Sequence, residues 1–527
     1  MAASDTFSEG DKHLERLAAF LSNPKTHGVH ASAISDAIET HGAMIFLVGD
    51  RAYKIKKPVA LPYMDLSTVA RRRRICRREV EINRRTAPDI YLGVGEVVVG
   101  RDGHWRLLGP DTDRADGERL VESVVVMRRF DDGLLFDRLA ERGALTDHDL
   151  DALAVTIAEA HSEAPKRRQR SGASRVADVL EINTSGLEAG VPEVFEAAPV
   201  RDLVERTEAV AAHLRSPLDA RARRGAVRRC HGDLHLRNVF RGDDGQPVLF
   251  DALEFDEDLA TIDVAYDLAF ILMDLRHRGL TTEANRVWNG WVSATGDDGA
   301  AAVLPLFLSM RAAVRAHVGA TAAVQRKLDS AKSDEARRYL EQARQALNPV
   351  VPAVVAIGGI SGTGKTTLAR AVAHLLGPPP GAVVLRSDVV RKRQLGVAET
   401  ERLPKAAYEP AVSSKVFAEI HRRARRLAEF GSAVIADAVY GRCEDRRAIA
   451  RAAGRAGTRF LGVWLELPKE EAQSRVAKRR GDASDATVDV VAKQATSIVS
   501  PRNWLVLDAT RPVAELAAEV VEAVRNH

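Results

Sequence analysis

A glycine-rich loop constrains the C-terminal part of this chain more than any other sequence feature. The segment GISGTGKT fits the pattern G-x-x-x-x-G-K-[ST] and lies between the β-branched run AVVAI and the helical run TLARAVAHLL. Glycines let the backbone approach a phosphate closely, N–H groups at a helix start surround it, and a lysine adds a positive charge. A Gly-rich turn that binds nothing is the alternative. We expect nucleotide binding here, with Thr366 also a Mg²⁺ ligand, by Gly359, Ser361, Gly362, Thr363, Gly364, Lys365, Thr366 and Thr367.

The surrounding residues predict a domain built on a parallel sheet. Beyond residue 350, apolar runs alternate with helical segments, which is typical of a parallel sheet wrapped by helices. Upstream, residues 333–347 predict an amphipathic helix, which Asn348-Pro349 ends. We therefore expect an α/β P-loop domain at 350–527 after a separate domain at 1–345. The strands are expected at 353–358, 382–386, 432–436, 460–465 and 504–507.

Two aspartates follow expected strands of this domain. Asp388 comes after the run VVLR, and Asp437 closes the run AVIAD. Ligands bind outside the carboxyl ends of parallel strands, so Asp388 is a candidate catalytic base and Asp437 a candidate Mg²⁺ ligand. Alternatively, Asp388 caps the following helix and Asp437 is a turn residue. Arg479, in the basic segment RVAKRR, is a candidate phosphate-binding lid residue or part of a solvated helix end.

The C-terminal part resembles the small P-loop kinases of the gluconate kinase, chloramphenicol phosphotransferase and zeta-toxin type. The resemblance covers roughly residues 350–527 and rests on GISGTGKT, SDVVR, AVIAD and RVAKRR. It implies that the chain binds a nucleotide and transfers a phosphoryl group. It also implies that Asp388 activates the acceptor hydroxyl.

A second constellation lies in the segment HGDLHLRN of the first domain. Asp233 and Asn238 are five residues apart, the interval between the base and the metal-binding Asn in the H-R-D-x-x-x-x-N loop of kinases. A hairpin signal follows and ends at Asp251, thirteen residues after Asn238. The segment resembles the aminoglycoside phosphotransferase-like kinases, over roughly residues 30–330. The resemblance implies that Asp233 is the catalytic base, that Asn238 and Asp251 bind metal, and that Asp267 braces the loop.

The residues before this loop resemble the small lobe of such a kinase. Lys54 and Lys56 share one face of an expected strand, and Lys54 is preferred as the phosphate contact. Glu79, in an expected helix at 67–86, is its candidate partner, with Glu81 as the alternative. The segment VVVMRRF would be the hinge, where the backbone from Met127 to Arg129 meets adenine. No G-x-G-x-x-G loop precedes Lys54.

Composition excludes several other classes of protein. The net charge is only +4 over 527 residues, and three distant cysteines form no metal or disulfide pattern. The arginines at 71–85 are interpreted as a solvated outer face, so a nucleic-acid partner is not expected. No leader peptide and no membrane span is expected, and we predict a cytoplasmic protein. The oligomeric state stays open.

The sequence thus predicts an α+β bilobal protein-kinase-like domain followed by an α/β P-loop domain with a parallel sheet. The small lobe is expected at about 1–127 and the large lobe at about 128–345. We predict an ATP- and Mg²⁺-dependent phosphotransferase that acts on a hydroxyl of a small polar metabolite such as a sugar, amino sugar or aminoglycoside. Alternatively, the P-loop half is a nucleotide-sensing regulator, or a kinase of nucleic-acid 5′-hydroxyls or of a nucleotide sugar.

Overall fold

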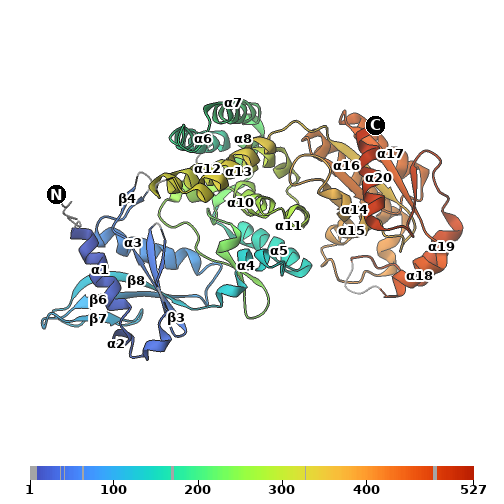
Figure 1. Ribbon diagram of the computed structural model, residues 1–527. Coiled ribbons are helices and arrows are strands. Elements are labelled where there is room, and N and C mark those ends of the chain that lie inside the picture. The colour runs from blue at the N-terminus through green and yellow to red at the C-terminus, as the bar shows by residue number, and fades with distance from the viewer. Residues whose placement is uncertain are drawn as a thin grey trace. The chain divides into compact units, whose positions relative to one another are not determined.

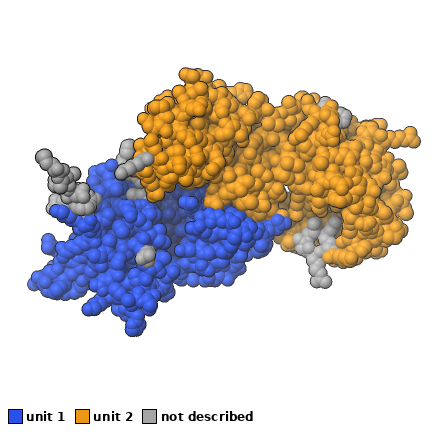
Figure 2. Space-filling view, viewed as in Figure 1, with its two compact units in different colours: residues 1–149, 163–167, 228–262 blue, residues 150–162, 168–227, 263–527 orange. Residues whose placement is uncertain are grey.

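The computed structural model describes residues 9–35, 37–40, 42–61, 64–167, 171–326, 328–478 and 483–526. The chain divides into two compact units (Figure 2). Unit 1 comprises residues 1–149, 163–167 and 228–262, and unit 2 comprises residues 150–162, 168–227 and 263–527. Because α5 (Asp147–Glu163), β9 (Val227–Arg229) and β12 (Thr261–Asp263) cross these limits, each contributes residues to both units.

Unit 1 contains a six-stranded sheet in the order β1-β2-β3-β8-β6-β7 (Figure 1). Its long helix α3 packs on β6 and β8. The sheet strands are β1 (Ile38–Glu39), β2 (Ala43–Val48), β3 (Arg51–Lys56), β6 (Tyr91–Val99), β7 (Trp105–Leu108) and β8 (Arg119–Arg128). The remaining elements are α1 (Glu9–Leu21), α2 (Pro24–His27), β4 (Ala60–Leu61), β5 (Met64–Asp65), α3 (Val69–Asn83), α4 (Phe136–Glu141), β10 (Val239–Arg241), β11 (Pro247–Leu249) and α9 (Glu257–Ala260), with short 3-10 turns at 31–33, 132–134 and 236–238.

Local signals in the sequence explain the β2–β3 hairpin and the start of helix α3. The β2–β3 hairpin is antiparallel and turns at Gly49-Asp50, a pair of residue types that favours tight turns. Helix α3 begins after Thr68, whose hydroxyl accepts a hydrogen bond from the backbone N–H of Arg71. The expectation of a wholly solvated arginine face was wrong for Arg72. Its guanidinium is 3% exposed and donates to Glu122, because strand β8 carries this carboxylate on its buried side.

Unit 2 begins with a helical part and continues into a P-loop part. In the helical part, α12 and α13 form an antiparallel pair, which packs on α6, α7 and α10. Its helices are α6 (Gly172–Glu188), α7 (Ala197–His213), α8 (Arg215–Arg223), α10 (Val264–His277), α11 (Thr281–Thr295), α12 (Leu304–Gln325) and α13 (Ser330–Ala346), with a 3-10 turn at 298–302.

The P-loop part contains the predicted parallel sheet, in the order β14-β15-β13-β16-β17. Strand β13 is central, and helices α14 and α20 bury a contiguous apolar cluster against the sheet. The strands are β13 (Ala353–Gly358), β14 (Val383–Arg386), β15 (Val434–Asp437), β16 (Arg459–Glu466) and β17 (Leu505–Asp508). The helices are α14 (Lys365–Ala373), α15 (Ser387–Gln394), α16 (Pro410–Glu429), α17 (Cys443–Arg455), α18 (Lys469–Lys478), α19 (Val488–Ser497) and α20 (Val513–Asn526), with a 3-10 turn at 405–408.

Both parts of the predicted fold class are therefore present: an antiparallel sheet with helices, then a parallel sheet with helices. The five strands of the P-loop part lie within two residues of their predicted limits. Among the described residues, no helix combines the length and apolar character needed to cross a membrane.

Helix α11 covers an edge of the parallel sheet. Strand β14 is an edge strand, and such a strand presents unpaired backbone groups. The Asn289 side chain occupies this edge: its Oδ1 accepts from the N–H of Val384 at 2.7 Å, and its Nδ2 donates to Ala382 O at 3.1 Å. Asn285 also donates to Ala382 O, at 3.1 Å. A side-chain amide thus replaces a neighbouring strand, and the helical part stabilises the P-loop part.

We expect Asn289→Ala to destabilise the P-loop part by about 1–3 kcal/mol, because it leaves the partly buried N–H of Val384 without its acceptor and removes one of the two donors to Ala382 O. Hydrogen exchange at the Val384 amide should accelerate, and the thermal unfolding midpoint should fall. Thr282→Ala, at an exposed position of the same helix, is the control and should change neither. Unchanged exchange at Val384 in the Asn289 variant would contradict this role.

Candidate active sites

The phosphate loop follows the central strand and has the backbone that close approach requires. Gly359, Gly362 and Gly364 have φ values of 138°, 89° and 89°, in the region that side chains other than glycine rarely adopt. A Cβ at Gly362 would lie 2.5 Å from the carbonyl oxygen of Ala472 in α18. Helix α18 thus packs directly on the loop, and this position accepts glycine alone.

Thr366 and Asp437 lie together at the carboxyl ends of the strands. Strands β13 and β15 pair in parallel with Ile357 opposite Asp437, which places the end of β15 beside the start of the loop. The Thr366 hydroxyl donates to Asp437 Oδ2 at 2.6 Å. A hydroxyl and a carboxylate are oxygen ligands of the kind Mg²⁺ prefers, so the donor set at this place fits the expected metal.

Three other predicted residues of the loop are hydrogen-bonded within the loop or to helix α19. Lys365 Nζ donates to Ile360 O at 2.8 Å, and the buried Thr363 hydroxyl donates to the same carbonyl at 2.9 Å. The N–H of Ser361 donates to Gln494 Oε1 at 2.7 Å. Thr367 is exposed in the first turn of α14. Gln494 was not found from the sequence, because it lies on α19, 133 residues from Ser361, and carries no motif.

Asp388 lies in the first turn of α15, next to Asp437. Withdrawal from water raises its pKa, the negative charge of Asp437 raises it further, and Arg386 and Lys365 partly oppose both effects. A carboxyl group with a raised pKa takes up a proton more readily, which suits a general base. The neighbouring Arg391 is buried and donates to Ala407 O at 2.7 Å. Arg479 lies outside the described residues.

In unit 1, the segment HGDLHLRN forms a tight loop. The Asn238 side-chain nitrogen donates to Asp233 Oδ2 at 3.1 Å and to Asp233 O at 2.9 Å, and His235 Nε2 lies 3.5 Å from Asp233 Oδ2. His231 bridges the loop to the hairpin, since its Nε2 lies 2.9 Å from Phe250 O. Asp233 is thereby oriented while its side chain stays 42% exposed, as a base that meets an external substrate must be.

Lys54 and Lys56 point the same way from β3 into a cluster of carboxylates. Lys54 Nζ contacts Glu79 Oε1 at 2.7 Å and Asp251 Oδ1 at 2.6 Å. Lys56 Nζ contacts Glu79 Oε2 at 2.7 Å and Glu254 Oε1 at 2.5 Å. Glu79 thus pairs with both lysines, and only Lys54 also reaches the candidate metal ligand. The pairing of Lys56 with Glu254 was not found from the sequence.

Asp251 lies at the point where the hairpin β10–β11 returns to this cluster. Its φ of 59° is unusual for a residue with a side chain, and such strain concentrates at functional sites. The Tyr91 hydroxyl accepts from its N–H at 3.1 Å. Withdrawal from water would raise the pKa of Asp251, but the charge and hydrogen bond of Lys54 outweigh this and hold it at about 2. The carboxylate stays ionised at neutral pH and its oxygens, with that of the Asn238 amide, fit a divalent metal.

Most of the expected hinge segment VVVMRRF lies in β8, and only its last two residues follow the strand. Met127 is still in the sheet, opposite Ala52 of β3 and Tyr91 of β6. The backbone N–H of Arg129 donates to Asp50 O at 2.8 Å, so this amide is already bonded within the protein. Phe130, the last residue of the hinge segment, stacks on Phe240 with the ring centres 4.2 Å apart, and Phe250 packs edge-on against both rings. The sequence did not single out this aromatic cluster.

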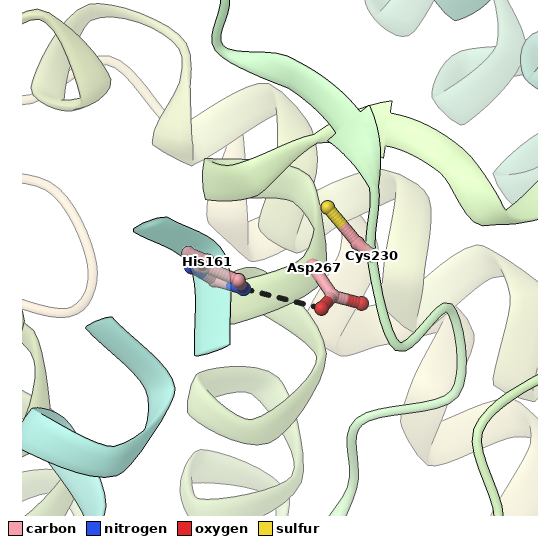
Figure 3. A group of neighbouring side chains, drawn as sticks. All are labelled: His161, Cys230 and Asp267. Atoms are coloured by element: carbon pink, nitrogen blue, oxygen red, sulfur yellow. Dashed lines mark hydrogen bonds and ion pairs between the residues drawn. The ribbon is translucent and has the colours of Figure 1, made fainter. Parts of the chain in front are cut away.

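Within unit 2, Asp267 belongs to a buried hydrogen-bonded chain, and Figure 3 shows its contact with His161. His161 Nε2 lies 3.2 Å from Asp267 Oδ2, and Trp291 Nε1 donates to His161 Nδ1 at 3.1 Å. Because Trp291 occupies Nδ1, the imidazole carries its hydrogen on Nε2 and donates to Asp267. The sequence singled out Asp267, and the structure joins it to His161 of α5.

Two family models match this chain, one before residue 350 and one after it. Residues 103–303 match the Phosphotransferase enzyme family. Residues 354–501 match an AAA domain. The chain therefore combines a phosphotransferase-family domain with a nucleotide-binding P-loop domain, and it is an enzyme of the kinase type.

Relatives and solved structures match over long segments. The uncharacterized protein Rv2004c of Mycobacterium tuberculosis is 31% identical over 473 residues, which are 88% of this chain and 90% of the relative. A gluconokinase structure from Sinorhizobium meliloti 1021 matches 34% of this chain and 94% of its own, at 20% identity and a TM-score of 0.25. An aminoglycoside 2′-phosphotransferase-IIIa variant in complex with GDP matches 63% and 97%, at 15% identity and a TM-score of 0.39.

The raised pKa of Asp388 predicts a pH-dependent effect on stability. A carboxyl group whose pKa rises on folding stabilises the fold fully below its unfolded pKa, and this stabilisation is lost as the pH rises through the folded pKa. Asp388→Asn removes the repelled charge, so without nucleotide and Mg²⁺ it should raise the thermal midpoint at pH 7.5. The gain should vanish as the pH approaches about 4, the ordinary range of an aspartate.

Asp485→Asn is the matched comparison, with the opposite sign. Bonds from Tyr408 and Leu403 and the charge of Lys392 outweigh withdrawal from water and lower the pKa of Asp485. Its ionised form therefore stabilises the fold at neutral pH, and the variant should unfold at a lower temperature. An Asp388 variant that is less stable than the wild type at pH 7.5 would refute the charge repulsion inferred here.

Proposed function

We propose that this chain, which belongs to the same family as Rv2004c of Mycobacterium tuberculosis, carries two ATP-dependent kinase sites. In the first, the γ-phosphate of ATP is transferred to a hydroxyl of a small polar metabolite such as a sugar, an amino sugar or an aminoglycoside. The second, in residues 350–527, transfers phosphate to a different hydroxyl.

The observation that carries the first site is the continuous set of contacts from Lys54 to Asp251. Phosphoryl transfer needs positioned charges and an oriented hydroxyl more than covalent help from the protein. Lys54, held by Glu79, supplies a fixed positive charge for the phosphates of the nucleotide, and Asp251 stays ionised beside it. Met127 and Arg129 belong to the segment where adenine would lie.

Asp233 is the proposed base of this reaction. It accepts the proton of the acceptor hydroxyl, and Asn238 fixes its orientation through the amide nitrogen. Asn238 and Asp251 would hold Mg²⁺ through oxygen atoms. When bound, the metal neutralises charge on the phosphates. The exposure of Asp233 favours a substrate that brings its hydroxyl in from solvent.

In the P-loop half, Asp388 is the proposed base. Residues 359–367 would surround the phosphates of a second nucleotide, and Thr366 with Asp437 would hold its Mg²⁺. Arg479 is proposed as a phosphate contact from its sequence position alone. One observation favours the alternative of a nucleotide-sensing regulator: Arg391, the cation near Asp388 that could hold an anionic acceptor, is already bonded to Ala407 and Ser413 of its own domain.

The first site is tested in the full-length chain with Asp233→Asn. Loss of the base should lower phosphoryl transfer by about 10²–10⁴-fold while nucleotide affinity changes little. The measurement is mass-spectrometric detection of phosphate on a panel of sugars, amino sugars and aminoglycosides, with calorimetry for ATP·Mg²⁺ binding. Asp243→Asn, 83% exposed in the nearby hairpin turn, is the control. Turnover of the Asp233 variant at the level of this control would exclude Asp233 as the base.

The second site is tested with Lys365→Ala, also in the full-length chain. Removing the ammonium should weaken nucleotide binding to the P-loop half at least tenfold, so calorimetry should lose one of two binding events. Persistence of the products that depend on Asp233, at a lower rate, would assign the P-loop half a regulatory role. Two unchanged binding events would refute the nucleotide site.

A further inference from the structure

Unit 2 contains a cavity of about 320 Å³ away from the phosphate loop. Its wall comes from α15, from α16, and from the connection after α11 in the helical part. Small-molecule pockets begin at about 300 Å³, so the volume suits a compact ligand. The cavity is lined mainly by charged residues, which are Arg393, Glu419, Arg422, Arg423, Arg426 and Asp298.

The charges in this wall do not balance. Four guanidinium groups face two carboxylates, and 4 − 2 leaves +2. Each carboxylate forms an ion pair with one arginine. Arg423 Nη2 donates to Asp298 at 2.6 Å, and Arg422 Nη2 donates to Glu419 at 2.6 Å. The unbalanced charge therefore belongs to the other two arginines.

Arg393 and Arg426 have no carboxylate within 4.0 Å in the described part of the chain. Arg393 donates to Ser293 O at 3.1 Å, and the Arg426 guanidinium lies 5.4 Å from the centre of the Phe430 ring. Partial withdrawal from water lowers the pKa of Arg393 and the charge of Arg423 lowers it further, while Asp298 and Glu419 only partly oppose this. An anion bound in the cavity would offset both the withdrawal of the Arg393 charge from water and its repulsion by Arg423.

Gly296 makes room for one of these groups. It ends α11 with a φ of 67°, and a Cβ there would lie 1.8 Å from Nη2 of Arg393. The Arg393 guanidinium therefore lies directly against the backbone of the helical part. The cavity is built from both parts of unit 2, and Arg393 and Arg422 stay open to solvent at its mouth.

We propose that this cavity binds a phosphate group, free or carried by a small metabolite, as an effector of the P-loop half. Paired guanidinium groups bind phosphate through several charge-assisted hydrogen bonds, and a charge of +2 matches a phosphate dianion. Arg393 lies in the last turn of α15, and Asp388 lies in the first turn of the same eight-residue helix. A ligand that holds Arg393 thus acts on the helix that positions the proposed base.

Binding is measured by calorimetry on the full-length chain, with Lys365→Ala present throughout so that the phosphate loop contributes little. The probes are inorganic phosphate, glycerol 3-phosphate and, as the uncharged control, glycerol. Both phosphates should bind and glycerol should not. Tighter binding of glycerol 3-phosphate identifies a phosphorylated metabolite as the ligand, and equal binding identifies free phosphate.

The variants are chosen to separate this cavity from other positive surfaces. Arg393→Gln combined with Arg426→Gln should weaken phosphate binding at least tenfold, and Gly296→Ala should weaken it by displacing Arg393 without removing a charge. Arg425→Ala is the matched control, because Arg425 lies on the same helix, is paired with Glu429 and does not line the cavity. It should leave the affinity within twofold.

The effector role has its own readout, in chains that keep Lys365. Glycerol 3-phosphate or phosphate should change the affinity of the P-loop half for ATP·Mg²⁺ at least threefold, and the Arg393/Arg426 double variant should lose this response. Absence of phosphate binding, or equal binding by the double variant and the Arg425 control, would overturn the proposal. Binding without any response in nucleotide affinity would overturn the effector role.

Discussion

Two ammonium groups withdrawn from water organise unit 1. Lys54 and Lys56 are 7% and 5% exposed, and a buried charge is costly unless it is paired and hydrogen-bonded. The carboxylates that meet this need come from helix α3 and from the segment after β11, so the strand, the helix and the hairpin must come together for the fold to form. Moving Asp251 away would leave the buried charge of Lys54 short of one partner, and this cost holds Asp251 in its position.

The same interactions connect stability to chemistry. Lys54 lowers the pKa of Asp251 and at the same time holds the strained turn in which Asp251 lies. Glu79 is shared by two lysines, so neither ammonium can move without a change at the other. A rigid arrangement of this kind provides charges that need no reorganisation when a substrate binds.

Much of the fold could be predicted, because its signals are local. The strand, loop and helix around residues 359–366 follow from apolar runs, glycines and a lysine that are adjacent in sequence, and the start of α3 follows from the hydroxyl residues Ser67 and Thr68, of which the structure uses Thr68 as the cap. The two-residue period of a strand placed Lys54 and Lys56 on one face. It could not show which carboxylates lie there, because Asp251 and Glu254 are 197 and 198 residues away. Gln494, beside the phosphate loop, was missed for the same reason.

The edge of the parallel sheet shows why the two parts of unit 2 act on each other. Asn289 pairs with β14, and Arg423 forms a buried ion pair with Asp298. Helix α15 follows directly from β14 and packs on α16, which carries Arg423. The strand before Asp388 and the helix that packs on α15 are therefore both tied to the helical part through groups that are expensive to separate. A change in the helical part that shifts α11 must therefore either break these bonds or move β14 and α16, and with them the helix α15 that lies between them in the chain.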